Sequence, residues 1–157
     1  WTIFIPTLPH LKSIIKKKTA SWKTKTLIID DINQINHYYN NVFASITCSG
    51  TATLEIAKRN IPQIIIYKLN FMTEIILKIL VKVRKACILN IVSNKIIIPE
   101  IINSQLSKKK LIICFEKLIN DKNFRDEQIK NINYHLPKIE TDESPFDKSI
   151  ERILKII

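Results

Sequence analysis

Residues 42–55 read Val42-Phe43-Ala44-Ser45-Ile46-Thr47-Cys48-Ser49-Gly50-Thr51-Ala52-Thr53-Leu54-Glu55 and contain the one glycine of the 157-residue chain. The β-branched and aromatic residues of 42–47 predict a strand, and the run from Leu54 to Asn60 predicts a helix. Where a strand passes through Ser-Gly-Thr into a helix, the first backbone N–H groups of the helix and the positive end of its dipole point outward. This junction can therefore bind an anion.

The side chains at the junction suggest which anion would fit. Gly50 permits close approach of the backbone to a ligand. Thr51 and Glu55 are four residues apart and share one face of the helix. Phosphate at the N–H groups and a sugar diol at the carboxylate would suit a nucleotide-sugar. The alternative is ordinary capping, since a threonine at a helix start stabilises the helix by roughly 1 kcal/mol. The heptapeptide by itself leaves both interpretations open.

Strand and helix patterns alternate along the chain, which predicts an α/β fold with a parallel sheet and covering helices. Ile64-Ile65-Ile66 is apolar on both faces, as a central parallel strand should be. The expected strands are residues 3–5, Thr26–Ile29, 44–47, Gln63–Tyr67 and a short one near 86–89. The expected helices are residues 9–18, Ile32–Tyr39, 51–60, 73–82, Lys108–Asn120, 123–133 and 145–156, with Asp30-Asp31 as the cap of the second.

Several short motifs follow one another in a fixed order. They are Phe4-Ile5-Pro6-Thr7-Leu8-Pro9, Ser49-Gly50-Thr51-Ala52-Thr53-Leu54-Glu55, Pro62-Gln63-Ile64-Ile65-Ile66-Tyr67-Lys68, Thr73, Leu80-Val81-Lys82, Leu89-Asn90-Ile91 and Pro99-Glu100. In this order they resemble the carboxyl-terminal half of the lipid-A-disaccharide synthase family, which are bacterial glycosyltransferases. The resemblance extends over about residues 3–118. Two departures stand out: the family's Leu-Pro-Asn loop reads Ile88-Leu89-Asn90, without the proline, and the Ala-Gly that usually follows reads Val92-Ser93-Asn94-Lys95, with no glycine.

The resemblance implies a fold and an activity. The fold is one half of a GT-B enzyme, with a Rossmann-like donor-binding domain over residues 1–138 and a helical carboxyl-terminal extension, a linker and terminal helix, over 139–157. The parent enzyme transfers 2,3-diacylglucosamine from its UDP donor to lipid X in the lipid A pathway of Gram-negative bacteria, and it needs no metal or other cofactor. The family's amino-terminal domain, which binds the lipid acceptor and carries the catalytic aspartate, has no counterpart in this sequence.

The resemblance also implies roles for particular residues. Backbone N–H groups of the Ser-Gly-Thr segment would hold phosphate, and Glu55 would accept hydrogen bonds from the ribose hydroxyls. Asn90 would line the donor cleft, supported by Tyr67 and Lys68. The implied donor-binding residues are Ser49, Gly50, Thr51, Glu55, Tyr67, Lys68 and Asn90, and no catalytic residue is expected in this chain. We expect an inactive fragment; a non-catalytic remnant or a partner-dependent half of a split gene stays open as the rival.

Composition excludes several other classes of protein. The net charge of +11 is spread along a lysine-rich chain, and no zinc-finger spacing, aromatic RNA-binding pattern or arginine-rich arm accompanies it, so nucleic-acid binding is not expected. Cys48, Cys87 and Cys114 are too far apart for a zinc site, and their odd number does not suggest a disulfide framework. They are expected to be small buried residues in a reducing cytoplasm. The three histidines lack the spacing of metal ligands.

Two of the predicted helices are amphipathic, and each presents an apolar stripe that another part of the protein, a membrane or a second molecule would cover. Residues 71–83 carry an apolar stripe opposite Lys78 and Lys82, which fits a core-facing helix and also fits peripheral contact with the inner membrane. The terminal helix carries an apolar stripe at helical spacing, and its exposure would favour self-association. That stripe consists of Phe146, Ile150, Ile153, Leu154 and Ile157.

Overall fold

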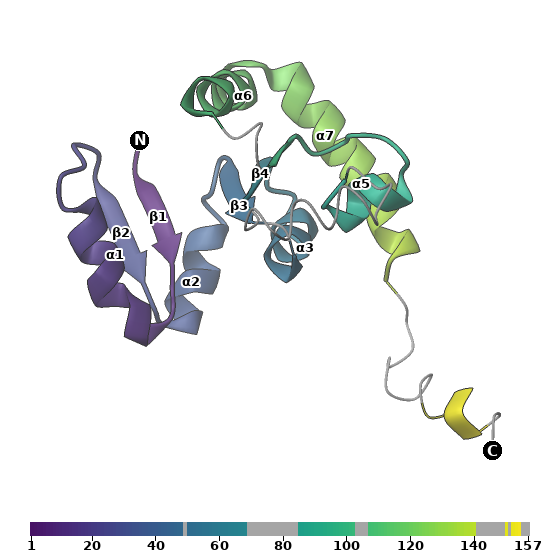
Figure 1. Cartoon of the computed structure of the whole chain (residues 1–157), viewed down its shortest axis with the longest axis horizontal. Helices are drawn as coiled ribbons and strands as arrows, with labels where there is room; N and C mark the ends of the chain where they lie inside the picture. Colours follow the sequence, from purple (N-terminus) through teal and green to yellow (C-terminus); the bar gives the residue numbers. More distant parts are fainter. Residues whose placement is uncertain (49, 69–84, 103–106, 141–149, 151, 155–157) are drawn as a thin grey trace. The chain divides into compact units, whose positions relative to one another are not determined.

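The computed structural model describes residues 1–48, 50–68, 85–102, 107–140, 150 and 152–154. The chain divides into two compact units, Trp1–Val42 and Phe43–Ile157 (Figure 1). Both units contain parallel strands with helices packed on them, so the predicted α/β class with parallel pairing and covering helices is confirmed.

The first unit is a strand–helix–strand–helix segment. Its elements are β1 (Ile3–Pro6), the short 3₁₀ helix η1 (Pro9–Leu11), α1 (Lys12–Thr19), β2 (Thr26–Ile29) and α2 (Ile32–Tyr39). The two strands pair in parallel, with Ile3 opposite Thr26. The Phe4 ring stacks on Tyr38 at 5.3 Å between ring centroids and meets Tyr39 edge-on at 5.6 Å, which fixes α2 against the strand pair.

The acidic pair before α2 behaves partly as predicted. Asp31 caps the helix, since its carboxylate accepts hydrogen bonds from the backbone N–H groups of Asn33 at 2.8 Å and Gln34 at 3.3 Å. Asp30 has a different partner, Lys12 Nζ at 2.6 Å. It therefore joins the start of α1 to the end of β2, and its hydrogen bond to Lys12 lowers the pKa of the Asp30 carboxyl.

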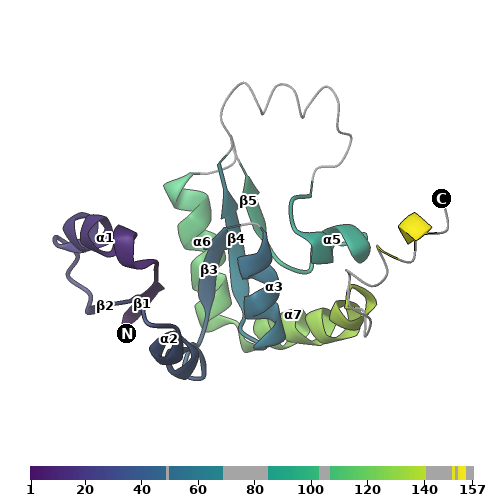
Figure 2. The same cartoon turned by 90° about the horizontal axis from the view of Figure 1, so that it is seen from below.

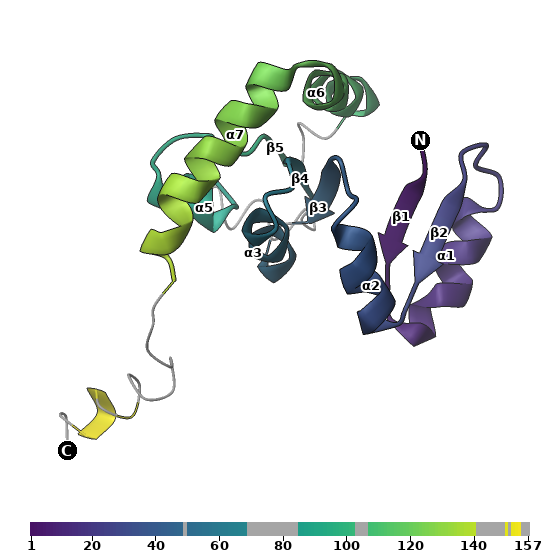
Figure 3. The ribbon, with the colours of Figure 1, turned by 180° about the vertical axis from the view of Figure 1, so that it is seen from behind.

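The second unit contains a three-stranded parallel sheet in the order β3-β4-β5. Figures 1 and 2 show α3 on one face of this sheet and α6 on the other. In Figure 3, α7 extends from α6 across to α5. The elements are β3 (Ser45–Cys48), α3 (Thr51–Lys58), β4 (Gln63–Tyr67), α5 (Ile88–Val92), β5 (Glu100–Ile102), α6 (Lys108–Asn120), α7 (Lys122–His135) and η3 (Leu136–Lys138).

The central strand supports both layers of this unit. Ile64 lies in a buried cluster with Ile101 and Leu118, on the face covered by α6. Ile65 lies in the opposite cluster, with Ala57 of α3 and Ile132 of α7. Because successive side chains of a strand point to opposite faces, β4 is buried on both sides, and its prediction as a central strand is confirmed.

One predicted strand is wrong. Residues 86–89 form no strand: Ala86 and Cys87 are irregular and α5 begins at Ile88. The third strand is β5, which pairs in parallel with β4 through Ile65 opposite Glu100. The physical reason is that the backbone N–H groups of Ala86 and Cys87 donate to the Glu100 carboxylate, so they are not available for a strand ladder.

Asparagine ends two helices of the second unit. Asn60 follows α3 with φ of 55° and Asn94 follows α5 with φ of 53°, and these are positive-φ positions that glycine commonly occupies. Of the other predicted helices, 73–82 lies outside the described residues. The terminal helix is described only at Ile150 and residues 152–154, which are helical.

Candidate functional site

The turn between β3 and α3 requires glycine for conformational reasons. Gly50 has φ of 125° and ψ of −154°, a combination that is essentially restricted to glycine. A Cβ atom added there would meet no other atom of the described residues beyond its chain neighbours within 4 Å, so the requirement comes from the backbone and not from crowding. Ser49, the residue before it, lies outside the described residues.

Thr53 holds the first turn of α3 against the end of β3. Its side chain is buried, and its Oγ1 donates to the backbone oxygen of Cys48 at 3.0 Å. Its backbone N–H donates to the Gly50 oxygen at 3.1 Å. Both ends of the turn are thereby fixed, although sequence reasoning gave Thr53 no role.

Gln63, at the start of β4, fixes the same turn from the other side. Its fully buried amide donates from Nε2 to the Thr53 oxygen at 3.0 Å and accepts from Thr47 Oγ1 at 2.9 Å. The side chain therefore bridges β3 and α3. A glutamine inside an apolar run is the sequence signal for such a bridge, because a buried amide must find partners.

Thr51 and Glu55 are both exposed on α3, one turn apart, as their spacing predicted. The Glu55 carboxylate lies 3.4 Å from Arg59 Nη2, which is a surface ion pair one further turn along the helix. Such exposed pairs contribute little, about 0.3–0.5 kcal/mol. The Glu55 side chain is 50% exposed, so its carboxylate lies at the surface.

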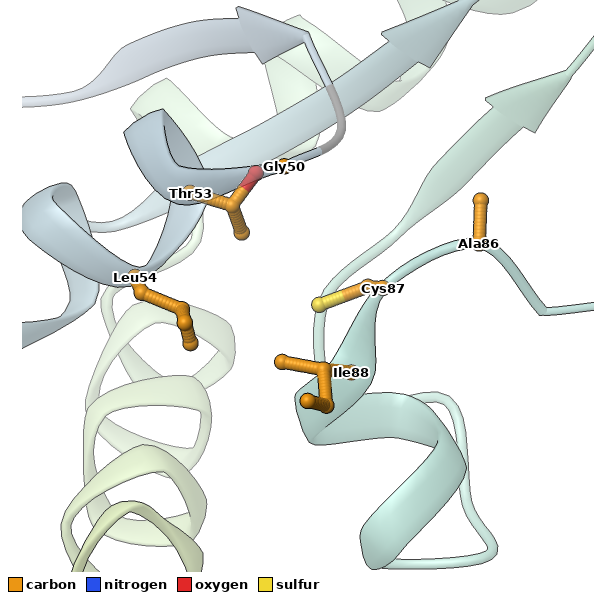
Figure 4. Close-up of a pocket in the computed structure, with 6 residues that line it drawn as sticks. All are labelled: Gly50, Thr53, Leu54, Ala86, Cys87 and Ile88. Carbon is orange, nitrogen blue, oxygen red and sulfur yellow. The ribbon is translucent and has the colours of Figure 1, made fainter. Parts of the chain in front are cut away.

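A pocket of about 160 Å³ opens beside the turn. Figure 4 shows Thr53 and Leu54 of α3 facing Cys87 and Ile88 across it. The lining residues are Gly50, Thr53, Leu54, Ala86, Cys87 and Ile88. One wall thus comes from the start of α3, and the other from the segment that leads into α5.

Two polar side chains hold the second wall. Glu100 accepts from the backbone N–H of Ala86 at 2.7 Å and of Cys87 at 3.1 Å. Asn90 is fully buried; it donates to Glu100 Oε1 and to the Ile98 oxygen, and its Oδ1 accepts two backbone N–H groups. These four bonds fill the capacity of an amide. Asn90 therefore lies behind the pocket wall and is not among the lining residues.

Tyr67 is the last residue of the central strand, and Lys68 follows it. Tyr67 is half-buried and lies opposite Ile102 in the parallel register, and Lys68 is exposed. Cys48 lies opposite Ile66 in the neighbouring strand, so the Gly50 turn and Tyr67-Lys68 share one edge of the sheet. In open α/β sheets ligands bind beyond this edge. Neither Tyr67 nor Lys68 lines the pocket itself.

The cysteines differ from one another in environment. Cys87 is buried, and burial raises the pKa of its thiol. Cys114 is half-buried, but Cys48 is exposed, so the expectation of three buried cysteines is wrong for Cys48. Among the described residues, no three His, Cys, Asp or Glu side chains gather as metal ligands would. Within that same part of the chain, no helix has the length and apolar character to cross a bilayer.

The comparisons with known proteins all point to the same family. The model of the lipid-A-disaccharide synthetase family matches residues 3–154. The lipid-A-disaccharide synthase of Bradyrhizobium diazoefficiens is 27% identical over 128 residues, which cover 82% of this chain and 33% of that protein. The Rhodospirillum centenum protein of the same name is 22% identical over 157 residues, 99% of this chain and 39% of that one.

A third relative is more similar over a shorter stretch. The lipid-A-disaccharide synthase of Acinetobacter baylyi is 36% identical over 87 residues, which cover 55% of this chain and 22% of that protein. The chain thus spans about a third of the length of the curated relatives that it matches.

Proposed function

The chain belongs to the lipid-A-disaccharide synthetase family, whose members are glycosyltransferases of lipid A biosynthesis, and we propose that it supplies the donor-binding part of such an enzyme. In this proposal residues 1–138 bind the UDP-sugar, and residues 139–157 are a linker and terminal helix. The donor is UDP-2,3-diacylglucosamine and the acceptor is lipid X. The enzyme works in the cytoplasm, at the surface of the inner membrane.

The donor diphosphate binds at the Gly50 turn. Backbone N–H groups of Ser49, Gly50 and Thr51 hold the phosphates at the amino end of α3, where the helix dipole favours negative charge. The observation that supports this most is the backbone of Gly50: its φ is 125°, and apart from its chain neighbours no atom of the described residues lies within 4 Å of where a side chain would begin. A ligand can therefore approach the main chain closely.

Other residues of the site contact or support the rest of the donor. Glu55 accepts hydrogen bonds from the ribose hydroxyls, and the exposure of its side chain supports this role. Lys68 and Tyr67 contribute at the shared sheet edge. Asn90 acts from behind the 86–88 wall, since all four hydrogen bonds of its amide are made within the chain.

The chemistry proposed for the whole enzyme is departure of UDP as the acceptor hydroxyl attacks the sugar. As the glycosidic bond to the diphosphate breaks, negative charge builds on UDP, and the α3 N–H groups and dipole stabilise it without a metal. Activation of the acceptor hydroxyl requires a base and a bound lipid beside the donor. We assign these to the part of the family's length that this chain does not cover, and we assign no catalytic residue to the chain itself.

A second candidate is a non-catalytic remnant, or half of a split enzyme, that binds without turnover. The observation that favours it is the departure from the family motif, where Ile88-Leu89-Asn90 lacks the proline and Val92-Ser93-Asn94-Lys95 has no glycine. Because proline restricts the backbone, the segment lacks one local restraint that the family motif provides.

Calorimetric titration of UDP into the purified chain tests the proposal. We expect UDP to bind and uridine, which lacks phosphate, to bind much more weakly. Absence of UDP binding up to about 1 mM, the weak end of measurable affinity, would contradict donor binding and favour the remnant. Equal affinities for UDP and uridine would exclude a phosphate site at the Gly50 turn.

A further inference from the structure

The two walls of the pocket are built very differently. Gly50, Thr53 and Leu54 belong to the start of α3, which is fixed to β3 by the Thr53 hydroxyl. Ala86 and Cys87 have no regular secondary structure, and the helix that begins at Ile88 has only five residues. A short helix contributes little stability of its own, so the second wall depends on contacts from elsewhere in the chain.

Glu100 supplies the hydrogen-bonded contact. It is the first residue of β5, and its place in the sheet is set by its pairing with Ile65 of the central strand. From there its carboxylate spans to the second wall: Oε2 accepts from Ala86 N at 2.7 Å and Oε1 accepts from Cys87 N at 3.1 Å. Hydrogen bonds to an ionised acceptor are stronger than those between neutral groups. The second wall is therefore tied to the sheet by this side chain, in addition to the packing of Cys87 and Leu89 in the buried cluster that contains Ile65.

Asn90 fixes the geometry of that side chain. Its Nδ2 donates to Glu100 Oε1 and also to the Ile98 oxygen at 2.7 Å. Its Oδ1 accepts from the backbone N–H groups of Ile97 at 2.9 Å and Ile98 at 3.0 Å. With every polar atom of a fully buried amide occupied, Asn90 holds Glu100 and the chain before it in one arrangement.

We infer that Glu100 is a positioning residue for the donor pocket, because it sets the distance of the 86–88 wall from α3 through the backbone of Ala86 and Cys87. This inference rests on the proposed function. It has a consequence for the orientation of the donor: since Glu100 occupies the N–H groups of Ala86 and Cys87, these two groups are not available to a ligand. The phosphates then bind on the Gly50 side, and the less polar part of the donor lies against the side chains of Cys87 and Ile88.

The buried thiol of Cys87 makes the inference measurable. Glu100→Gln keeps the size of the side chain, but its NH₂ group cannot accept a hydrogen bond, so one of the two backbone N–H groups loses its partner. Local opening of the wall would then expose Cys87 to a thiol reagent. We expect N-ethylmaleimide to modify Cys87 roughly ten-fold faster in the variant, with Cys114 unchanged as the internal reference, and UDP affinity to fall by about ten-fold.

Glu116→Gln is the matched control, since Glu116 is an exposed carboxylate of α6 and its loss makes the same change in net charge. It should leave both the Cys87 rate and UDP affinity unchanged. An unchanged Cys87 rate in Glu100→Gln would overturn the inference. A faster Cys87 rate with unchanged UDP affinity would also overturn it, because the contact would then be structural only.

The wild-type chain provides a measurement that needs no variant, in case Glu100→Gln does not fold. Saturating UDP should slow modification of Cys87 several-fold while Cys114 reacts as before, because a ligand between the walls favours the closed arrangement. If UDP binds and Cys87 reacts at the same rate, the positioning role is wrong. If UDP does not bind, the proposed function fails and the inference fails with it, whereas the rate in Glu100→Gln still shows whether the contact holds the wall.

Discussion

Gln63 and Gln128, 65 residues apart, form a reciprocal pair of hydrogen bonds in the interior of the second unit. Gln63 N donates to Gln128 Oε1 at 2.7 Å, and Gln128 Nε2 donates to the Gln63 oxygen at 3.0 Å. The side-chain amide of α7 thus pairs with the first residue of the central strand as a neighbouring strand would. Both residues are buried, so α7 is attached to the sheet by specific polar contacts as well as by apolar packing.

The first prediction concerns this pair. Gln128→Ala leaves the N–H and C=O of Gln63 without these partners in a buried position, and each unsatisfied group costs about 1–3 kcal/mol. We expect the free energy of unfolding in urea to fall accordingly. Asn133→Ala, at an exposed position of the same helix, is the control and should change it by less than about 0.5 kcal/mol. Equal effects of the two substitutions would show that the pair contributes nothing specific.

The second prediction concerns the turn before α3. Gly50→Ala forces a side chain into a backbone conformation that costs roughly 1–3 kcal/mol, or relaxes the turn out of that conformation. The melting temperature should therefore fall, and the affinity for UDP should fall as well. Asn60→Gly at the other end of α3 is the comparison, because its φ of 55° is one that glycine adopts freely. A Gly50→Ala variant as stable as wild type would mean that the turn has no need of glycine.

The third prediction separates ribose binding from helix stabilisation at Glu55. Glu55→Ala removes charge-assisted hydrogen bonds of about 1.5–3 kcal/mol, which weakens UDP binding by roughly one to two powers of ten. The melting temperature should change little. Arg59→Gln removes the same exposed ion pair but retains the carboxylate. It should leave UDP affinity within about three-fold. If both variants bind UDP like wild type, Glu55 serves only the helix.

The fourth prediction is that the chain by itself transfers no sugar. Rate acceleration requires the acceptor and its base to be held against the donor, and we assign both to the part of the family that this chain does not cover. Incubation with both lipid substrates should release no UDP above background. Turnover by the chain alone would refute that assignment. Recovery upon adding a separately produced acceptor domain would favour a split enzyme over a remnant.

The fifth prediction concerns the terminal helix. Ile150, Ile153 and Leu154 are 55%, 56% and 68% exposed, and neighbouring exposed apolar side chains favour association. Sedimentation should show self-association that depends on concentration and weakens when residues 145–157 are deleted. A wild-type chain that stays monomeric at tens of micromolar, a working range for patches of this kind, would count against it.

Local patterns account for the part of the fold that the sequence predicted. The strand–glycine–helix junction and the doubly apolar β4 are each encoded within a few consecutive residues, so periodicity and turn chemistry were enough. The third strand was not predictable in this way. Residues 86–89 and Glu100–Ile102 are both short and mostly apolar, and which of them pairs with β4 depends on contacts made far along the chain.

The candidate site also contains residues that local sequence predicts and residues whose role depends on distant contacts. The Gly50 turn follows from a residue type whose conformation is special, and the structure shows that conformation. Asn90 could be singled out only by its motif, and the pattern gave no sign that residues 97–100 would occupy its whole amide. Glu100 and Gln63 were missed for a related reason: their partners, at Ala86, Cys87 and Thr53, are ten or more residues distant.

The asparagines that end α3 and α5 explain how this chain can dispense with glycine almost entirely. Asn60 and Asn94 adopt the left-handed helical conformation at φ of 55° and 53°, which asparagine tolerates better than most residues. At Gly50 the backbone lies outside the range that asparagine tolerates. Asparagine can therefore stand in for glycine at these two helix ends, but not at Gly50, the residue that borders the pocket.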